Sequence, residues 1–241
     1  MTRSDSVQTS DGRAPWGLIA ALPVELGPFR GAGRGEVVGG VRLSFHQIPD
    51  GPPLLAAVAG VGKVAAAHAA ATLVARGVQG LLVVGTCGGL DAVDEVGTLV
   101  HAEKAVQWDL GVREGRVLVP DPALAAAWQE EAPGQLRTFL TADRAALGQL
   151  QRARRARAVR RSGDPTPVAD METAAVAAVA VRAGLPWAAL RVVSDQRLRL
   201  RDRLTSRGRS RGRFQDHLET VAGRPAETVA ALLRARDRGN R

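Results

Sequence analysis

The sequence predicts an α/β fold of three layers, α/β/α, in which helices cover both faces of a central, twisted sheet that is mixed and largely parallel. Apolar runs of strand length alternate with alanine-rich runs of helical character along most of the chain. Several of the apolar runs are continuous and lack polar alternation, which is typical of strands buried on both faces. Glycine or proline closes many of these runs, so the elements have defined ends.

The apolar runs are expected to form the strands. The run that begins at Trp16 is short and is stopped by Pro23. The run 41–48 alternates apolar and polar residues, which predicts a half-exposed strand, whereas the run 80–89 is strongly apolar and passes into a glycine turn. The expected strands are 16–22, 41–48, 53–60, 80–89, 97–106, 115–120, 136–142 and 187–194.

The alanine-rich runs are expected to form the helices. A helix of high intrinsic propensity stops at Gly77, and another ends at Gly184. Asp121 followed by Pro122 is a possible N-cap with proline at the first helical position. The expected helices are 61–77, 121–132, 143–159, 171–184 and one or two closing helices over 214–236, broken at 223–225.

Length and composition favour one cytoplasmic domain. The 241 residues can bury one sizeable core, with 45% hydrophobic residues. We expect a disordered polar tail over 1–15 and a single domain over 16–238, because residues 1–15 lack the apolar block of a signal peptide. No apolar run is long enough to predict a membrane span. Cys87 is the only cysteine, which fits a reducing compartment and excludes an internal disulfide.

The unusual residues follow the ends of predicted strands. In sheets of this kind, ligands bind at the carboxyl ends of the strands, which directs attention to the turns after Leu22, Gly60, Gly85, Ala169 and Val193. Those turns carry the candidate residues, which are Glu25, Thr86, Cys87, Gly88, Asp170, Met171, Glu172, Ser194 and Asp195.

Each candidate also has a purely structural interpretation. Small residues at 85–89 let a ligand approach the backbone, or simply make a tight turn. Asp170 and Glu172 lie where acids stabilise a helix start, although a carboxylate there also suits a ribose diol. Asp195 is either a turn residue or a partly buried acid that carries a proton, and Glu25 is either a surface acid or a general base.

Four motifs in this order and spacing resemble the purine nucleoside phosphorylase and uridine phosphorylase superfamily. They are "GVGKVAAA", "GTCGGL", "VADMETAAVAAVA" and "RVVSD". The resemblance is greatest to 5'-methylthioadenosine/S-adenosylhomocysteine nucleosidases and covers roughly residues 17–195. It implies the phosphorylase/hydrolase-like fold and cleavage of a purine nucleoside without a metal or organic cofactor.

The resemblance also implies a role for each matching residue. Glu25 resembles the water-activating glutamate, and Asp195, steadied by Ser194, would serve purine N7. Thr86 stands where the family has a serine near the sugar. Met171 would pack under the ribose, and Glu172 would accept its hydroxyls. Family members are usually dimers or larger, so the resemblance implies a homodimer in which a neighbour contributes to the site.

The residues favour water over phosphate as the acceptor. A phosphorylase needs arginine and backbone N–H donors for the phosphate dianion. In the phosphorylases that the chain resembles, one arginine precedes the "GTCGG" turn and another lies in the loop after the first strand. Here leucine and valine precede the turn, and the loop carries Glu25. Arg30 is near enough in sequence to keep phosphorolysis open. The alternatives are therefore a purine or hopanoid-associated phosphorylase and a futalosine hydrolase.

Departures from the family leave the 5' substituent and even the class of function open. The segment 105–115 is shorter and lacks the family's pocket-lining aromatic residues, and Ala145–Ala146 replace a Phe and an aliphatic residue. From Arg197 to Arg213 nearly every second residue is arginine, which predicts a solvated, flexible loop and, with the net charge of +9, permits nucleic-acid binding. A basic nucleic-acid-binding module and a non-catalytic nucleoside-binding module stay alternatives, although aromatics at 3% offer few stacking platforms.

Overall fold

The computed structural model describes residues 12–31, 33–90, 94–112, 114–144, 167–195 and 218–239, with Asp195 described by its backbone only. Several expectations fall outside these ranges. They are the tail up to residue 11, most of the helix expected over 143–159, the Ala145–Ala146 pair and the arginine-rich segment 197–213.

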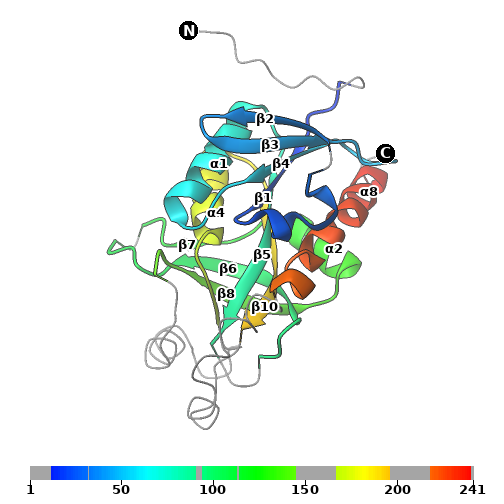
Figure 1. Ribbon diagram of the computed structural model, residues 1–241. Helices are drawn as coiled ribbons and strands as arrows, with labels where there is room; N and C mark the ends of the chain where they lie inside the picture. The colour runs from blue at the N-terminus through cyan, green and yellow to red at the C-terminus, as the bar shows by residue number, and fades with distance from the viewer. Residues whose placement is uncertain are drawn as a thin grey trace.

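A mixed sheet forms the centre of the molecule, as predicted (Figure 1). It is not largely parallel, because in the described ranges as many strand pairs are antiparallel as parallel. The strand order is β10-β6-β8-β9-β5-β1-β4-β3-β2, with β7 paired to β6 and β10 also paired to β5. The strands are β1 Trp16–Ala20, β2 Arg34–Val38, β3 Val41–His46, β4 Leu54–Val58, β5 Leu81–Gly89, β6 Leu99–Gln107, β7 Val117–Leu118, β8 Gln135–Thr141, β9 Val168–Asp170 and β10 Trp187–Asp195.

Four strands of the sheet, β1, β4, β5 and β10, run in the same direction. Strand β1 pairs in parallel with both β4 and β5, and β10 pairs in parallel with β5. Strands β5, β10, β6, β8 and β9 also form a closed ring. Its antiparallel pairs are β10–β6 and β5–β9, and β6–β8 and β8–β9 are parallel. The carboxyl ends of β1, β4, β5 and β10 therefore lie close to one another.

Helices cover both faces of the sheet (Figure 1). Helices α1 (Lys63–Ala75) and α4 (Thr173–Arg182) lie on one face, and α2 (Pro122–Glu131) and α8 (Val229–Gly239) lie on the other. The short α7 (Arg224–Glu227) precedes α8, and a 3₁₀ helix, η1 (Pro23–Phe29), follows β1. The predicted cap of α2 is confirmed, because Asp121 Oδ1 accepts the N–H of Leu124 at 2.7 Å.

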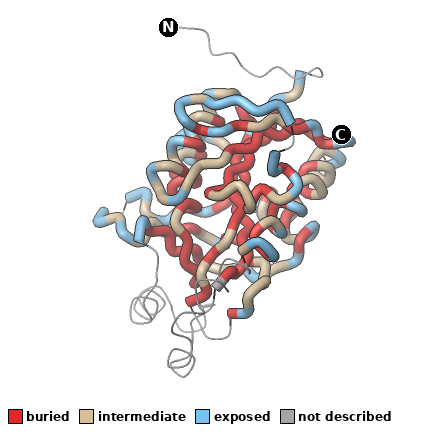
Figure 2. The backbone as a smooth tube through the Cα atoms, viewed as in Figure 1, coloured by how far each residue is buried: buried red, intermediate tan, exposed pale blue. Residues whose placement is uncertain are grey.

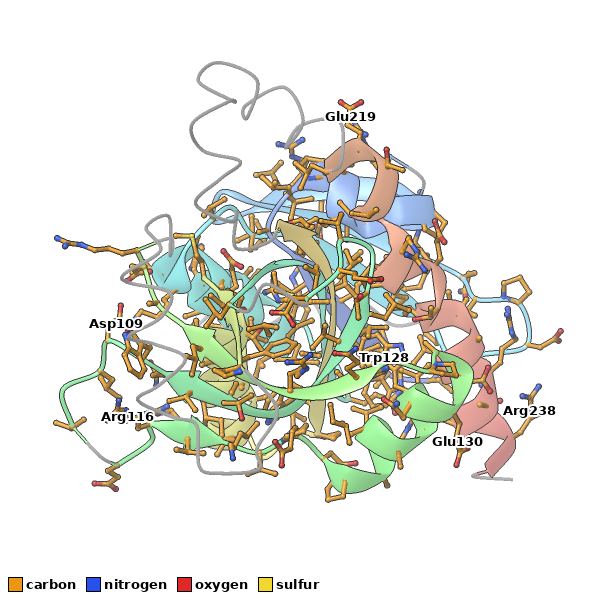
Figure 3. The ribbon with its side chains drawn as sticks, turned by 90° about the horizontal axis from the view of Figure 1, so that it is seen from below. Asp109, Arg116, Trp128, Glu130, Glu219 and Arg238 are labelled. Atoms are coloured by element: carbon orange, nitrogen blue, oxygen red, sulfur yellow. The ribbon has the colours of Figure 1, made fainter. Side chains whose placement is uncertain are left out.

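The core consists of an apolar cluster on each face of the sheet, and the strands between the helices are almost wholly buried (Figure 2). Trp128 of α2 is labelled in Figure 3, and its indole N–H donates at 2.8 Å to the hydroxyl of Thr228, the residue before α8. Its indole group thus meets the rule that a buried tryptophan N–H finds an acceptor. Within the described ranges, no helix has the length and apolar character needed to cross a membrane.

Candidate functional site

Hydrogen bonds join five strands of the sheet, or the turns that follow them, through residues far apart in the sequence. Glu25, after β1, binds Thr86 of β5, and Glu172, after β9, binds the backbone of Gly62, after β4. Arg191 of β10 binds both Thr86 and Glu172. We call Glu25, Thr86, Asp170, Glu172 and Arg191 the Arg191 cluster.

Glu25 is buried and accepts four hydrogen bonds. Its Oε2 accepts the backbone N–H groups of Ala21 at 3.0 Å and Leu22 at 2.9 Å. Its Oε1 accepts both the backbone N–H and the hydroxyl of Thr86, each at 2.9 Å. The interpretation of Glu25 as a surface acid is therefore wrong, since the side of η1 that carries it faces the sheet and only 2% of the residue is exposed.

Gly85 makes room for the Glu25 carboxylate. Its backbone has a φ of +139°, in the region that favours glycine, and a Cβ built there would lie 2.8 Å from Glu25 Oε1. The backbone angle and the space taken by the Glu25 carboxylate therefore both require a glycine at position 85. A ligand approach to the backbone is not needed to explain it.

Arg191 occupies the centre of the cluster with every nitrogen of its guanidinium engaged. Nε donates to Thr173 Oγ1 at 2.9 Å and Nη1 donates to the carbonyl of Thr86 at 2.8 Å. Nη2 lies 3.2 Å from Glu172 Oε2 and 3.0 Å from Asp170 Oδ2. Burial lowers the pKa of Arg191, but the charges of the nearby carboxylates outweigh it and raise the pKa overall.

Asp170 organises the start of α4. Its Oδ2 accepts the N–H of Thr173 at 2.7 Å and that of Glu172 at 3.3 Å, while its Oδ1 accepts the Thr141 hydroxyl. With the contact to Arg191, this carboxylate is fully enclosed, and its side chain has 0% exposure. Asp170 therefore binds the backbone that leads into α4, whose N-cap residue is Glu172.

Glu172 has fewer partners than Asp170, one on each carboxylate oxygen. Oε1 accepts the N–H of Gly62 at 3.0 Å, and Oε2 faces Arg191. Burial raises the pKa of Glu172, and the charges of Asp170 and Glu25 raise it further, although Arg191 and the Gly62 N–H oppose them. Glu172 therefore takes up a proton at a higher pH than an ordinary glutamate.

The other predicted site residues flank the Arg191 cluster. Cys87 and Gly88 lie on β5, where Cys87 is buried and Gly88 is partly exposed. Met171 is partly exposed between Asp170 and Glu172. Ser194 is buried and its hydroxyl donates to the Cys87 carbonyl at 3.4 Å.

Asp195 is placed by its backbone alone. It pairs with Gly88 across a register shift between Val193 and Asp195, so the β10 backbone brings it level with the glycine turn of β5. Nothing further is described of its side chain.

A second charged group connects the turns at the same edge. The Lys63 ammonium, at the start of α1, lies 2.6 Å from Asp109 Oδ1 and 3.9 Å from Asp143 Oδ2. Asp143 Oδ1 accepts the backbone N–H of Lys63 at 2.8 Å, and Asp109 Oδ2 accepts that of Asp143 at 3.1 Å. Lys63 follows Gly62 directly, so this group adjoins the backbone N–H that binds Glu172.

Sequence reasoning missed Arg191, Thr173 and Lys63. Arg191 carried a usable signal, because a charged residue inside the apolar run "WAALRVVS" has to be paired once that strand is buried. Lys63 carries a weaker signal, because two glycines between a strand and a helix more often indicate close packing of the two elements. Within the described ranges, no group of three or more His, Cys, Asp or Glu side chains could hold a metal ion.

Comparison with known proteins identifies the family. The sequence model of the phosphorylase superfamily matches residues 15–234. The chain belongs to the phosphorylase superfamily. The predicted resemblance and fold class are therefore both confirmed for this superfamily member.

Two kinds of nucleoside hydrolase are similar to this member of the superfamily. A 5'-methylthioadenosine/S-adenosylhomocysteine nucleosidase of Geobacillus thermodenitrificans is 28% identical over 211 residues, which cover 82% of this chain and 85% of that protein. The S-adenosylhomocysteine nucleosidase of Streptococcus pyogenes, solved with 5-methylthiotubericidin, has a TM-score of 0.79 at 23% identity, covering 94% of this chain and 99% of the other. The futalosine hydrolase of Helicobacter pylori has a TM-score of 0.75 at 20% identity, covering 91% and 97%.

Proposed function

We propose that this protein hydrolyses the N-glycosidic bond of a purine nucleoside, with 5'-methylthioadenosine, S-adenosylhomocysteine or a related 5'-modified adenosine as substrate. The observation that carries the proposal is the continuous chain of hydrogen bonds from Glu25 through Thr86 and Arg191 to Glu172. It joins a carboxylate suited to activate water with one suited to hold a ribose diol.

In the proposed reaction, the bond from the anomeric carbon to N9 breaks and its electron pair passes to the purine. Asp195, with Ser194 beside it, supplies the proton for N7, while Met171 and Glu172 bind the ribose on which positive charge develops. Water adds to the anomeric carbon and gives its proton to Glu25. The division between an acid and a base follows that of inverting glycosidases.

The engagement of Arg191 supports water as the acceptor. A phosphate dianion is held by free arginine forks and backbone donors. The three nitrogens of Arg191 already bind Thr173, Thr86 and the two carboxylates, and Arg30 is exposed at the end of η1. Two carboxylates beside Arg191 would also repel phosphate.

Four further residues of the predicted site have different roles in the proposed reaction, namely Asp170, Thr86, Cys87 and Gly88. Asp170 orients Arg191 and α4 and makes no substrate contact, since its side chain has no exposure. Thr86 and Gly88 are partly exposed on β5 and are the residues of that strand that would approach the sugar, with the buried Cys87 between them.

The chain is proposed to act as a homodimer. Val61 and Val64 are 55% and 81% exposed, and they flank the Gly62–Lys63 backbone that binds Glu172 and Asp143. Exposed apolar side chains this close to a site are suited to a second copy that covers it.

Light scattering should therefore give twice the monomer mass, and Val64→Asp should give monomers with a raised KM. A wild-type protein that is monomeric at micromolar concentration would contradict the proposal.

The activity is tested by supplying substrates with and without phosphate. The protein is incubated with methylthioadenosine, adenosylhomocysteine, adenosine, inosine and futalosine. We expect a free sugar product in the absence of phosphate, with 5'-modified adenosines cleaved fastest. Strict phosphate dependence with a sugar 1-phosphate product would assign a phosphorylase, and futalosine as the sole substrate would assign a futalosine hydrolase.

A further inference from the structure

The Glu25 carboxylate already accepts as many hydrogen bonds as it has lone-pair directions. A carboxylate offers about four acceptor sites. Four donors are bound to Glu25, two on each oxygen, at 2.9–3.0 Å. A base in this state has no lone pair directed at water, so one donor has to leave before Glu25 takes a proton.

Only one of the four donors is free to turn. Three are the backbone N–H groups of Ala21, Leu22 and Thr86, which the β1–η1 turn and strand β5 hold in place. The fourth is the Thr86 hydroxyl, whose hydrogen rotates about the C–O bond. Thr86 is also partly exposed, whereas Glu25 is buried.

We propose that Thr86 is a positioning residue whose hydroxyl donates to Glu25 in the free enzyme and turns to the bound nucleoside or the attacking water in the complex. The turn releases one lone pair of Glu25 Oε1 to accept the proton of that water. This inference rests on the proposed function, since it needs Glu25 to act as the base.

The Thr86 peptide stays fixed while the hydroxyl turns. Its N–H remains on Glu25 Oε1, and its carbonyl accepts from Arg191 Nη1 at 2.8 Å. The charge of Glu25 acts on Arg191 of β10 and on Glu172 at the start of α4. On α7, which packs against η1, Arg224 and Glu227 are exposed, and Arg224 donates to the Gly97 carbonyl. The imidazole of His46 on β3 packs against Phe29 of η1, and β1 and β4 carry no charged residue.

Thr86→Val tests the proposal, with Thr86→Ser as its matched control. Valine keeps the shape and the peptide contacts but removes the donor, whereas serine keeps the donor. The pH profile of kcat/KM reports the free enzyme and that of kcat reports the complex. In Thr86→Val the acid limb of kcat/KM should move up by about one pH unit, because the ionised carboxylate loses a donor. The acid limb of kcat should stay, and Thr86→Ser should match the wild type in both.

Two outcomes overturn the proposal. Equal movement of both limbs would show that the hydroxyl stays on Glu25 in the complex. Movement of neither limb would show that it does not influence Glu25 at all.

A measurement without turnover separates this proposal from the proposed function. The carboxyl carbon of Glu25 is followed by ¹³C NMR and assigned by its loss in Glu25→Gln. Thr86→Val should titrate at higher pH than the wild type when free, and at the same pH when both are bound to a C-nucleoside, whose glycosidic carbon–carbon bond is not hydrolysed. A persistent difference in the complex would contradict the role of Thr86 even if no nucleoside is cleaved.

Discussion

At the scale of single residues, the candidate site depends on how each carboxylate is satisfied. Asp170 is enclosed by its four partners, Glu25 is bound by backbone donors and Thr86, and Glu172 shares its oxygens between Gly62 and Arg191. Chemically similar acids therefore have different tasks because their surroundings differ, and only the structure shows which donors reach which oxygen.

Glu172 should give nucleoside binding a distinctive pH dependence. Burial raises the pKa of Glu172, so the ionised form that accepts ribose hydroxyls is lost as the pH falls through this raised value. In the Glu25→Gln protein, titration calorimetry should show methylthioadenosine binding weaken on acidification at a pH above the ordinary glutamate value of 4.5.

Adenine is the control for this prediction, since it lacks the ribose. Its affinity should not share the transition assigned to Glu172. The same acid transition for adenine and for the nucleoside would remove Glu172 from sugar binding.

At the scale of elements, continuous apolar runs predicted most of the strands within a few residues. The ends of these strands indicated where the candidate site residues lie. The segment 34–38 was missed because "RGEVV" is short, polar and exposed, and it forms β2 only through its partner β3. The helix η1 was missed because prolines at 23 and 28 indicate a loop, although proline is tolerated at the start of a helical turn. The pairing of β10 with β6 joins distant segments, which no local pattern indicates.

The Lys63 group should influence the site more than the stability of the fold. Lys63→Met removes the ammonium that binds Asp109 and leaves two carboxylates near each other. Because both acids are substantially exposed, the cost in unfolding free energy should be at most about 1 kcal/mol. Displacement of the adjoining Gly62 N–H from Glu172 should raise the KM for nucleoside several-fold with a smaller change in kcat.

Arg76→Met is the matched control for Lys63→Met. It removes an exposed ion pair with Glu36, remote from the cluster. Equal effects of both variants on KM would show that Lys63 has no particular relation to the site.

At the scale of the whole molecule, two buried histidines should make stability depend on pH. Burial lowers the pKa of His46 and of His101, although the Ala132 carbonyl partly opposes the change at His101. Their folded values lie below the unfolded value of 6.5, so the unfolded chain binds more protons. Stability is therefore full above about pH 6.5 and is lost as the pH falls below it.

Thermal unfolding between pH 8 and pH 5 checks this prediction. His46→Gln and His101→Gln should each flatten the dependence, by up to about 1.4 kcal/mol per pH unit for each group. His68→Gln, on the exposed face of α1, is the control. If the wild type and both buried-site variants lose stability equally on acidification, the histidines are not responsible.

The central claim is that Glu25 is the base for the attacking water, whereas other residues bind the nucleoside. A substitution of Glu25 should therefore lower turnover without weakening nucleoside binding. The most direct measurement is turnover of methylthioadenosine by Glu25→Gln together with its Kd for the same nucleoside. We expect kcat to fall by at least about a hundredfold while Kd changes less than about threefold, since glutamine keeps the shape of the side chain and an oxygen that accepts two of the four hydrogen bonds, but cannot take the proton. Near-normal turnover by Glu25→Gln would contradict the account.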